Sequence, residues 1–339
     1  MTRYQYDEIN AVHVELTSFC NLRCPQCARI NSGQLTANLP LSHMPFATVD
    51  KVFTELGQRV KYIHICGNYG DLALYPQALE AIDLIHHKTG GFIKAYSNGA
   101  AQTEGFWSEL GRRLQGDAGQ VVFSIDGLKD TNHLYRVGAN WEKLTANVKA
   151  FIQAGGAAVW EWLPFEHNDH QVEAAVELAK ALGFKSFILK RNPRFSPLNN
   201  GEHHTLKPSA KYVHQGIKRI EGFEPTLLPI RCKYKARKMI FIDFQGLVLP
   251  CCWHGNRFKG KKHNDMHEII ERYGRDGFDV SKHSIKDILQ HHWYTTAMDY
   301  TIKILPTCRK HCTMGQKMSN NSNRDVHTFV PHPDPEPWE

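Results

Sequence analysis

The sequence lacks any apolar run that approaches the roughly 20 residues of a membrane-spanning helix, and it has no apolar signal segment at its start. It also has no internal repeat. Its cysteine count is odd, nine in all, so without a secretion signal a disulfide framework is not expected. These absences predict a soluble protein of the reducing cytoplasm, with no membrane partner and with thiols free for other chemistry.

Positive charge is in excess, but no single segment concentrates it. The formal net charge is +7, with 20 histidines in addition, and the lysines and arginines are scattered along the chain. Nucleic-acid-binding proteins usually gather such charge into a patch or stripe. A nucleic-acid partner is therefore not the favoured interpretation, and part of the excess would balance anionic thiolates.

Residues 12 to about 190 alternate short apolar runs with amphipathic stretches, which is typical of repeated βα units around a parallel sheet. The expected strands are 12–17, 60–66, 92–97, 121–125, 157–163 and 185–189. The expected helices are 49–56, 76–86, 105–114, 140–154 and 171–182. Because crossovers between parallel strands are right-handed, six units predict an α/β fold of the partial (βα)6 TIM-like barrel type, open on one side.

Beyond the barrel the βα rhythm stops. A polar stretch with several prolines and the run Asn199-Asn200-Gly201 indicates a linker, and the last residues are too rich in proline for regular hydrogen bonding. We therefore divide the chain into a barrel at 8–195, a linker at 196–228, a small C-terminal domain at 229–320 and an extended tail at 321–339.

Three cysteines, Cys20, Cys24 and Cys27, follow directly on the first expected strand. Loops at the carboxyl ends of barrel strands build the active site in this kind of fold. Three thiolates at these spacings can surround one iron–sulfur cube, and they leave one of its four irons without a protein ligand. The alternative is a structural zinc knuckle, which would need His13 or His64 as its fourth ligand.

This CxxxCxxC loop, placed after the first strand, resembles that of the radical S-adenosylmethionine (SAM) superfamily. The resemblance implies a 4Fe-4S cluster on the three cysteines, with SAM bound at the open iron. It also implies SAM-binding residues after the following strands, although Asn68-Tyr69 depart from the family's Gly-Gly-Glu motif. These residues are Gly70, Asp71, Ser97, Asn98, Ser124, Asp126, Arg136 for the methionine carboxylate, and Asn168 near adenine. Helix capping is the alternative role for Asp71 and Asn168.

A second group of cysteines lies in the C-terminal third. A β-hairpin is expected at 238–244 and 247–250, turned at Gly246, with cysteines at both of its ends. The pattern resembles the opening half of the SPASM domain, truncated to the single-cluster form called a twitch domain. The resemblance implies an auxiliary 4Fe-4S cluster on Cys232, Cys251, Cys308 and Cys312, where Cys252 could replace its neighbour. A four-cysteine zinc ribbon is the alternative.

The resemblance further implies that a donor such as flavodoxin or ferredoxin supplies an electron that cleaves SAM. The resulting 5′-deoxyadenosyl radical would take hydrogen from an unactivated carbon. Oxidation would follow if the substrate radical loses an electron to the auxiliary cluster, and epimerisation if Cys252 or Cys66 returns hydrogen.

The substrate class is inferred from the start of the chain. Many peptide-modifying relatives carry a leader-binding domain before the barrel, whereas the first strand here begins near residue 12. A small or anionic metabolite is therefore the expected substrate, with a short peptide or protein side chain as the alternative. A zinc-stabilised RNA-binding protein fits the charge and the cysteines, but it explains neither the open three-cysteine loop nor the barrel rhythm.

Overall fold

The computed structural model describes residues 4–190, 206–212, 230–258, 265–298, 305–312 and 324–329. The strands are β1 (Ala11–Val14), β2 (Ile30–Asn31), β3 (Gln34–Leu35), β4 (Tyr62–Ile65), β5 (Phe92–Ser97), β6 (Gly119–Ser124), β7 (Ala158–Trp162), β8 (Ser186–Lys190), β9 (Met239–Ile242), β10 (Val248–Leu249) and β11 (Arg324–Thr328). The main helices are α1 (Phe46–Leu56), α2 (Ala78–Thr89), α3 (Glu104–Arg113), α4 (Asn132–Tyr135), α5 (Trp141–Gln153), α6 (Val172–Leu182), α7 (Lys233–Ala236), α8 (Cys252–Gly255), α9 (Asp265–Tyr273), α10 (Ile285–Gln290) and α12 (Pro306–Cys312).

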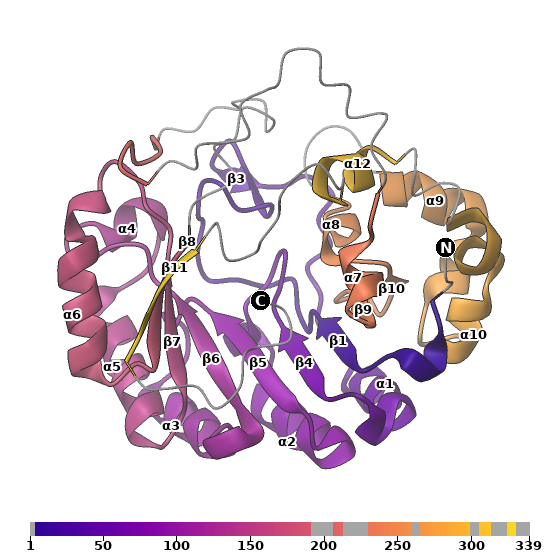
Figure 1. Cartoon of the computed structure of the whole chain (residues 1–339), viewed down its shortest axis with the longest axis horizontal. Helices are drawn as coiled ribbons and strands as arrows, with labels where there is room; N and C mark the ends of the chain where they lie inside the picture. The colour runs from indigo at the N-terminus through magenta and orange to yellow at the C-terminus, as the bar shows by residue number, and fades with distance from the viewer. Residues whose placement is uncertain are drawn as a thin grey trace.

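One sheet organises these elements. Its strand order is β10-β9-β1-β4-β5-β6-β7-β8-β11, and β1 and β4 to β8 are all parallel. Figure 1 shows the sheet as an arc, with α1, α2, α3, α5 and α6 along its outer side. The predicted α/β fold and the six parallel strands of a partial barrel are confirmed.

Helix α5 illustrates how the local sequence sets the outer layer. The Asn140 side chain caps its first turn by accepting a hydrogen bond from the Lys143 amide. Leu144, Val148 and Phe151 recur on one face and are buried against the sheet. The chain then turns at Gly156, where a β-carbon would lie 2.5 Å from the Phe151 ring, so only glycine fits.

The C-terminal hairpin forms as predicted, with β9 and β10 antiparallel and Gly246 at positive φ. Its place was not predicted, because β9 pairs in parallel with β1 and so continues the barrel sheet. The orange elements beside β1 in Figure 1 show this junction. Residues near the start of the chain and residues of its C-terminal third are therefore neighbours, and the second cysteine group lies near the barrel's first strand.

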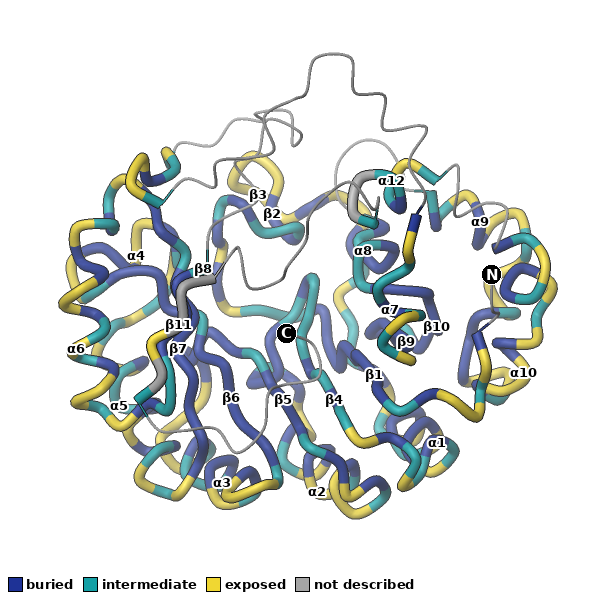
Figure 2. The backbone as a smooth tube through the Cα atoms, viewed as in Figure 1, coloured by how far each residue is buried: buried dark blue, intermediate teal, exposed yellow. Residues whose placement is uncertain are grey.

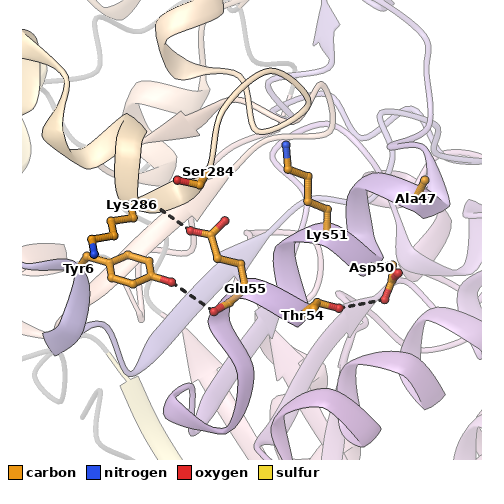
Figure 3. A pocket seen from close by; sticks show the side chains of 8 residues that line it. All are labelled: Tyr6, Ala47, Asp50, Lys51, Thr54, Glu55, Ser284 and Lys286. Atoms are coloured by element: carbon orange, nitrogen blue, oxygen red, sulfur yellow. Dashed lines mark hydrogen bonds between the residues drawn. The ribbon is translucent and has the colours of Figure 1, made fainter.

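Helix α10 is joined to the barrel through α1. The Glu55 carboxylate accepts hydrogen bonds from the amides of Ile285 and Lys286, at 2.8 and 3.0 Å, and thereby caps α10. Figure 3 shows Glu55 and Lys286 among the side chains that line a pocket of about 490 Å³. This pocket is lined by residues of α1 and α10 and by Tyr6, none of which belongs to the predicted active site.

Much of the predicted linker and tail lies outside the described residues. Of the linker only residues 206–212 are described, and of the tail only 324–329. Residues 324–328 form β11, which pairs antiparallel with β8, and the extended tail as a whole stays a prediction. Among the described residues, no helix has the length and apolar character needed to cross a bilayer.

The two faces of the sheet differ in chemistry. Outward-facing side chains such as Val12, Ile63 and Ile93 are buried under the helices, whose own outer surfaces are exposed (Figure 2). The opposite face carries a polar row across four adjacent strands, His13, His64, Lys94 and Gln120. Closed barrels of this type fill their interior with branched apolar residues. The polar row therefore suits a barrel that receives a polar solute.

Burial fixes the protonation of His13. Its Nε2 lies 2.6 Å from the Cys66 carbonyl oxygen and must donate, so its Nδ1 accepts from the Tyr234 hydroxyl at 2.8 Å. Burial lowers the pKa of His13 to about 4. The unfolded chain binds a proton near pH 6.5 that the folded chain takes up only near pH 4, so stability falls as pH falls through this window.

We therefore expect the free energy of unfolding to drop, between pH 7 and pH 5, by about 2 kcal/mol more in the unaltered protein than in His13→Gln. Urea unfolding at the two pH values measures this difference. His283→Gln, at an exposed position, should leave the drop unchanged. Equal drops for the unaltered protein and His13→Gln would show that His13 does not titrate as described.

Candidate active site

The three-cysteine loop leaves the carboxyl end of β1 and is tied to its neighbours. The Asp71 amide donates to the Phe19 carbonyl at 2.9 Å, and the Arg23 amide donates to the Val137 carbonyl at 3.0 Å. Within the loop, the amides of Leu22 and Arg29 point at the sulfurs of Cys20 and Cys27, each at 3.5 Å. The loop thus holds its thiols at the rim where the sequence predicts the active site.

The electrostatics of these thiols suit a cationic centre. Burial raises the pKa of Cys20 to about 12, and repulsion from Asp71 and from the other two thiolates adds to the shift. Burial also raises the pKa of Cys24 to about 11, although Arg136 opposes the shift. Without a cation the Cys20 and Cys24 thiols stay protonated at neutral pH, whereas bound iron would hold them as thiolates. Three coupled thiols therefore fit an iron–sulfur cluster.

A zinc knuckle fits this loop less well. Both ring nitrogens of His13 are engaged, by Tyr234 and by the Cys66 carbonyl. Within the described part of the chain, no three Cys, His, Asp or Glu side chains converge as the ligands of a single metal ion would. A cluster differs in this respect, because each thiolate binds a separate iron.

Asp71 joins the loop after β4 to the loop after β5. One carboxylate oxygen accepts from the Ala73 amide at 3.0 Å and from the Ser97 hydroxyl at 2.8 Å. The other accepts from the Asn98 amide and side chain, at 2.8 and 2.7 Å. Asp71 caps the short helix at Leu72–Leu74, so the capping alternative is present in the structure. Burial raises the pKa of Asp71, against these hydrogen bonds.

Asn98 in turn connects this network to the cysteine loop. Its side-chain amide donates to the Asn21 side chain at 2.9 Å and lies 3.8 Å from the Cys20 sulfur. The structure thus brings Asp71, Ser97 and Asn98 together beside Cys20. Gly70 packs against another segment of the backbone, because a β-carbon there would lie 1.9 Å from the Thr17 carbonyl oxygen. A glycine is therefore required for this contact, and the predicted role of Gly70 toward a ligand stays a prediction.

Arg136 and Asp126 form a pair on the other side of the loop. The Arg136 Nε lies 2.6 Å from an Asp126 oxygen, and its Nη1 lies 3.8 Å from the Cys24 sulfur. Asp126 is fully buried and Arg136 is 16% exposed. Asp126 also accepts from the Leu163 amide, and burial raises its pKa while Arg136 opposes that shift. A cation is thereby fixed next to a thiol, with guanidinium nitrogens left for an anionic ligand.

Ser124 and Asn168 differ in accessibility. Ser124 ends β6 and is half-buried at the rim. Asn168 is fully buried, and its side chain bonds to the backbone of Asp126, Leu163 and Phe165. Asn168 therefore holds the loops after β6 and β7 together in this structure, and contact with adenine stays a prediction.

The departure of Asn68-Tyr69 from the Gly-Gly-Glu motif has a structural explanation. The Asn68 side chain donates to the Cys252 carbonyl at 2.9 Å, and the Asn68 backbone carbonyl accepts from the Cys27 thiol at 3.9 Å. The Tyr69 hydroxyl accepts from the Phe258 amide at 3.0 Å, and its ring packs against Phe244 and Phe258. These two residues dock the C-terminal segment onto the barrel, and they stand between the two cysteine groups.

The second cysteine group also assembles. Cys251 interacts electrostatically with Cys232 and Cys308, and Cys312 interacts with Cys232 and Cys308, so the four predicted thiols are close together. The Arg231 amide donates to the Cys312 carbonyl at 3.0 Å, which ties α12 to the start of the hairpin. Burial raises the pKa of Cys251 well above its usual value. A bound cation would be needed to hold the Cys251 thiol as a thiolate at neutral pH.

Cys252 has other partners than its neighbour. Its thiol interacts electrostatically with the Tyr234 side chain, and Tyr234 hydrogen bonds to His13 on the polar face of the sheet. Burial raises the pKa of Cys252 to about 11. Cys66 also interacts with Cys252, with Glu15 and with the Lys190–Glu161 pair, which is 3.1 Å apart. Cys66 and Cys252, the two thiols outside both predicted ligand sets, thus lie near each other.

Sequence reasoning missed three residues of this region. Tyr234 and His254 lie among the second cysteine group, and Glu15 is buried with one carboxylate oxygen unpartnered among the described residues. Burial raises the pKa of Glu15 well above its usual value. The spacing of Cys251 and His254, three residues apart, is the signal that could have drawn attention to the histidine; Glu15 and Tyr234 carry no comparable one.

Solved structures show what this architecture resembles, although no protein-family model and no curated protein matches the sequence. SuiB of Streptococcus suis bound to S-adenosylmethionine gives a TM-score of 0.56 at 12% identity, over 87% of this chain and 68% of SuiB. SuiB bound to the precursor peptide SuiA gives 0.57 at 12% identity, over 93% and 69%. BtrN in complex with AdoMet and 2-DOIA gives 0.48 at 14% identity, over 89% and 92%.

The likeness to SuiB is one of fold. The chain has the fold of radical SAM enzymes, as the three-cysteine loop predicts. The zinc-stabilised RNA-binding alternative explains neither this fold nor the cysteine loop at its rim.

Proposed function

We propose that this protein is a radical SAM enzyme that removes hydrogen from an unactivated carbon of its substrate. The observation that carries the proposal is the trio of coupled thiols after β1, with Arg136 beside Cys24 and the Asp71–Asn98 network beside Cys20. When bound, a 4Fe-4S cluster on Cys20, Cys24 and Cys27 supplies an electron that cleaves SAM into methionine and a 5′-deoxyadenosyl radical.

The chain's own residues would bind and orient SAM. Arg136 offers a guanidinium to the methionine carboxylate, and its pairing with Asp126 holds it in place. Asn98 and Ser97, held by Asp71, together with Ser124, present polar groups along the same rim. The barrel and the segment docked on Asn68-Tyr69 would keep water from the radical. Anaerobic protein with dithionite and SAM should release 5′-deoxyadenosine; no release above a protein-free control would refute the proposal.

We further propose that Cys232, Cys251, Cys308 and Cys312 hold an auxiliary 4Fe-4S cluster. The protein with Cys20, Cys24 and Cys27 changed to Ala, prepared without oxygen, should contain about four irons and matching sulfide. Iron and sulfide analysis makes the measurement. Zinc without sulfide would establish the zinc-ribbon alternative, and Cys251→Ala and Cys252→Ala in this background decide which of the two cysteines is a ligand.

For the substrate, the polar inner row and the Lys190–Glu161 pair support a small polar or anionic metabolite. A peptide is the second candidate, and the fold likeness to SuiB, whose structure includes a precursor peptide, supports it.

Electrons would come from a flavodoxin- or ferredoxin-like donor. Oxidation would follow electron loss to the auxiliary cluster. Epimerisation would follow hydrogen return from Cys252, and inverted product from Cys252→Ala would remove that candidate.

A further inference from the structure

We propose that His254 sets the reduction potential of the auxiliary cluster by hydrogen bonding to the Cys251 sulfur, and that it thereby directs the reaction toward oxidation. The inference rests on the proposed auxiliary cluster. It makes His254 a positioning residue, which acts through a ligand of the cluster and not on the substrate.

The His254 ring lies between two of the four thiols. Its Nδ1 is 3.4 Å from the Cys251 sulfur, and its Nε2 is 3.9 Å from the Cys308 sulfur. A neutral imidazole carries one N–H, and the shorter contact assigns it to Nδ1. The Cys251 sulfur therefore accepts a hydrogen bond from the His254 ring.

The surroundings hold this ring in place. His254 is 2% exposed. It lies in α8, where the next residue, Gly255, packs so closely that a β-carbon would be 2.4 Å from the Phe241 ring. On the far side, an Asp265 oxygen accepts from the Thr307 amide at 2.9 Å and fixes α9 against α12, which carries Cys308. The backbone that carries His254 and the helix that carries Cys308 are therefore both held in place.

Hydrogen bonds to the sulfurs are among the factors that set the potential of an iron–sulfur cluster. Reduction adds a negative charge, and an N–H directed at a ligand sulfur stabilises that charge, most strongly where water is excluded. The His254 bond should therefore raise the potential and make the cluster a better electron acceptor.

This favours one fate of the substrate radical. A radical carbon that bears a hydroxyl can lose one electron to the oxidised auxiliary cluster and its O–H proton to water, which leaves a carbonyl. The reduced cluster would then pass its electron to the flavodoxin- or ferredoxin-type carrier. The competing fate, hydrogen return from Cys252, takes no electron from the substrate and gains nothing from a higher potential.

The test uses the full chain with Cys20, Cys24 and Cys27 changed to Ala, so that only the auxiliary cluster remains. His254→Phe removes the ring N–H, His254→Gln offers an amide N–H, and Tyr75→Phe removes a buried hydrogen bond to the Met44 carbonyl that involves no sulfur. EPR-monitored redox titration compares them. At the parent midpoint, His254→Phe should show an about tenfold lower ratio of reduced to oxidised cluster, equivalent to ~59 mV for one electron. His254→Gln and Tyr75→Phe should stay within about threefold.

A second measurement needs no substitution at His254. Pulsed EPR of the same background protein labelled with ¹⁵N-histidine should detect a weak nitrogen coupling to the reduced cluster, as a hydrogen bond gives. A strong coupling would make His254 a ligand, and no coupling would place it out of contact; either overturns the inference. So does an unchanged midpoint in iron-replete His254→Phe. A parent that binds no iron overturns the auxiliary cluster itself, which separates that failure from failure of the histidine's role.

Discussion

Cys24→Ala protein, reconstituted anaerobically and given dithionite and SAM, is expected to release 5′-deoxyadenosine at no more than about one thousandth of the unaltered rate. The reason is that the cofactors carry the chemistry, and Cys24 is one of only three thiols at this loop. It is also the most buried of the three, with Arg136 beside it. Chromatographic detection of the nucleoside makes the measurement, with iron counted in parallel.

The matched control is Ser32→Ala, an exposed position in the turn between β2 and β3 of the same segment. It should retain full iron content and full release of the nucleoside. Release at the unaltered rate from Cys24→Ala would mean that this loop does not hold the reactive cluster. The auxiliary iron should survive in Cys24→Ala, because its four ligands belong to the second cysteine group.

Arg136→Met is expected to lower the free energy of unfolding by about 3 to 5 kcal/mol. The substitution leaves the Asp126 carboxylate fully buried without its cationic partner, and an uncompensated buried charge is costly. Adding Asp126→Asn should recover most of the loss, because the amide oxygen can still accept from the Leu163 amide and carries no charge. Urea unfolding of the anaerobic unaltered protein and of both variants measures the difference.

An exposed ion pair provides the comparison. Arg113 lies 2.9 Å from Asp83 with both side chains partly in solvent, so Arg113→Met should cost less than about 1 kcal/mol. If Arg136→Met were no more destabilising than Arg113→Met, the Arg136–Asp126 pair would not be the buried anchor described here.

The barrel could be predicted because its information is local. Each strand is a short apolar run, and each helix carries an apolar stripe. Nearby residues mark where a helix begins and ends, as Asn140 and Gly156 do for α5. The right-handed crossover rule then leaves few arrangements. The pairing of β9 with β1 and of β11 with β8 depends on contacts between distant segments. No local pattern in the hairpin reveals that it will join another sheet.

The candidate site was also predictable only in part. The positions of the cysteine loop and of the polar residues after each strand could be predicted from their places in the βα units. The hydrogen bonds among those side chains could not be predicted from the sequence. Asp71 is saturated by Ser97, Asn98 and Ala73, and Asn168 by backbone groups, because loops that are separate in sequence meet at one rim. The role of Asn68-Tyr69 became visible only with the C-terminal segment in place.

EPR spectroscopy of the reduced, oxygen-free protein before and after addition of SAM tests the central claim most directly. If the cluster on Cys20, Cys24 and Cys27 keeps one iron open, SAM should bind that iron and change its spectrum, and Cys24→Ala should abolish the change. A spectrum of the unaltered, iron-replete protein that stays the same at saturating SAM would contradict the account.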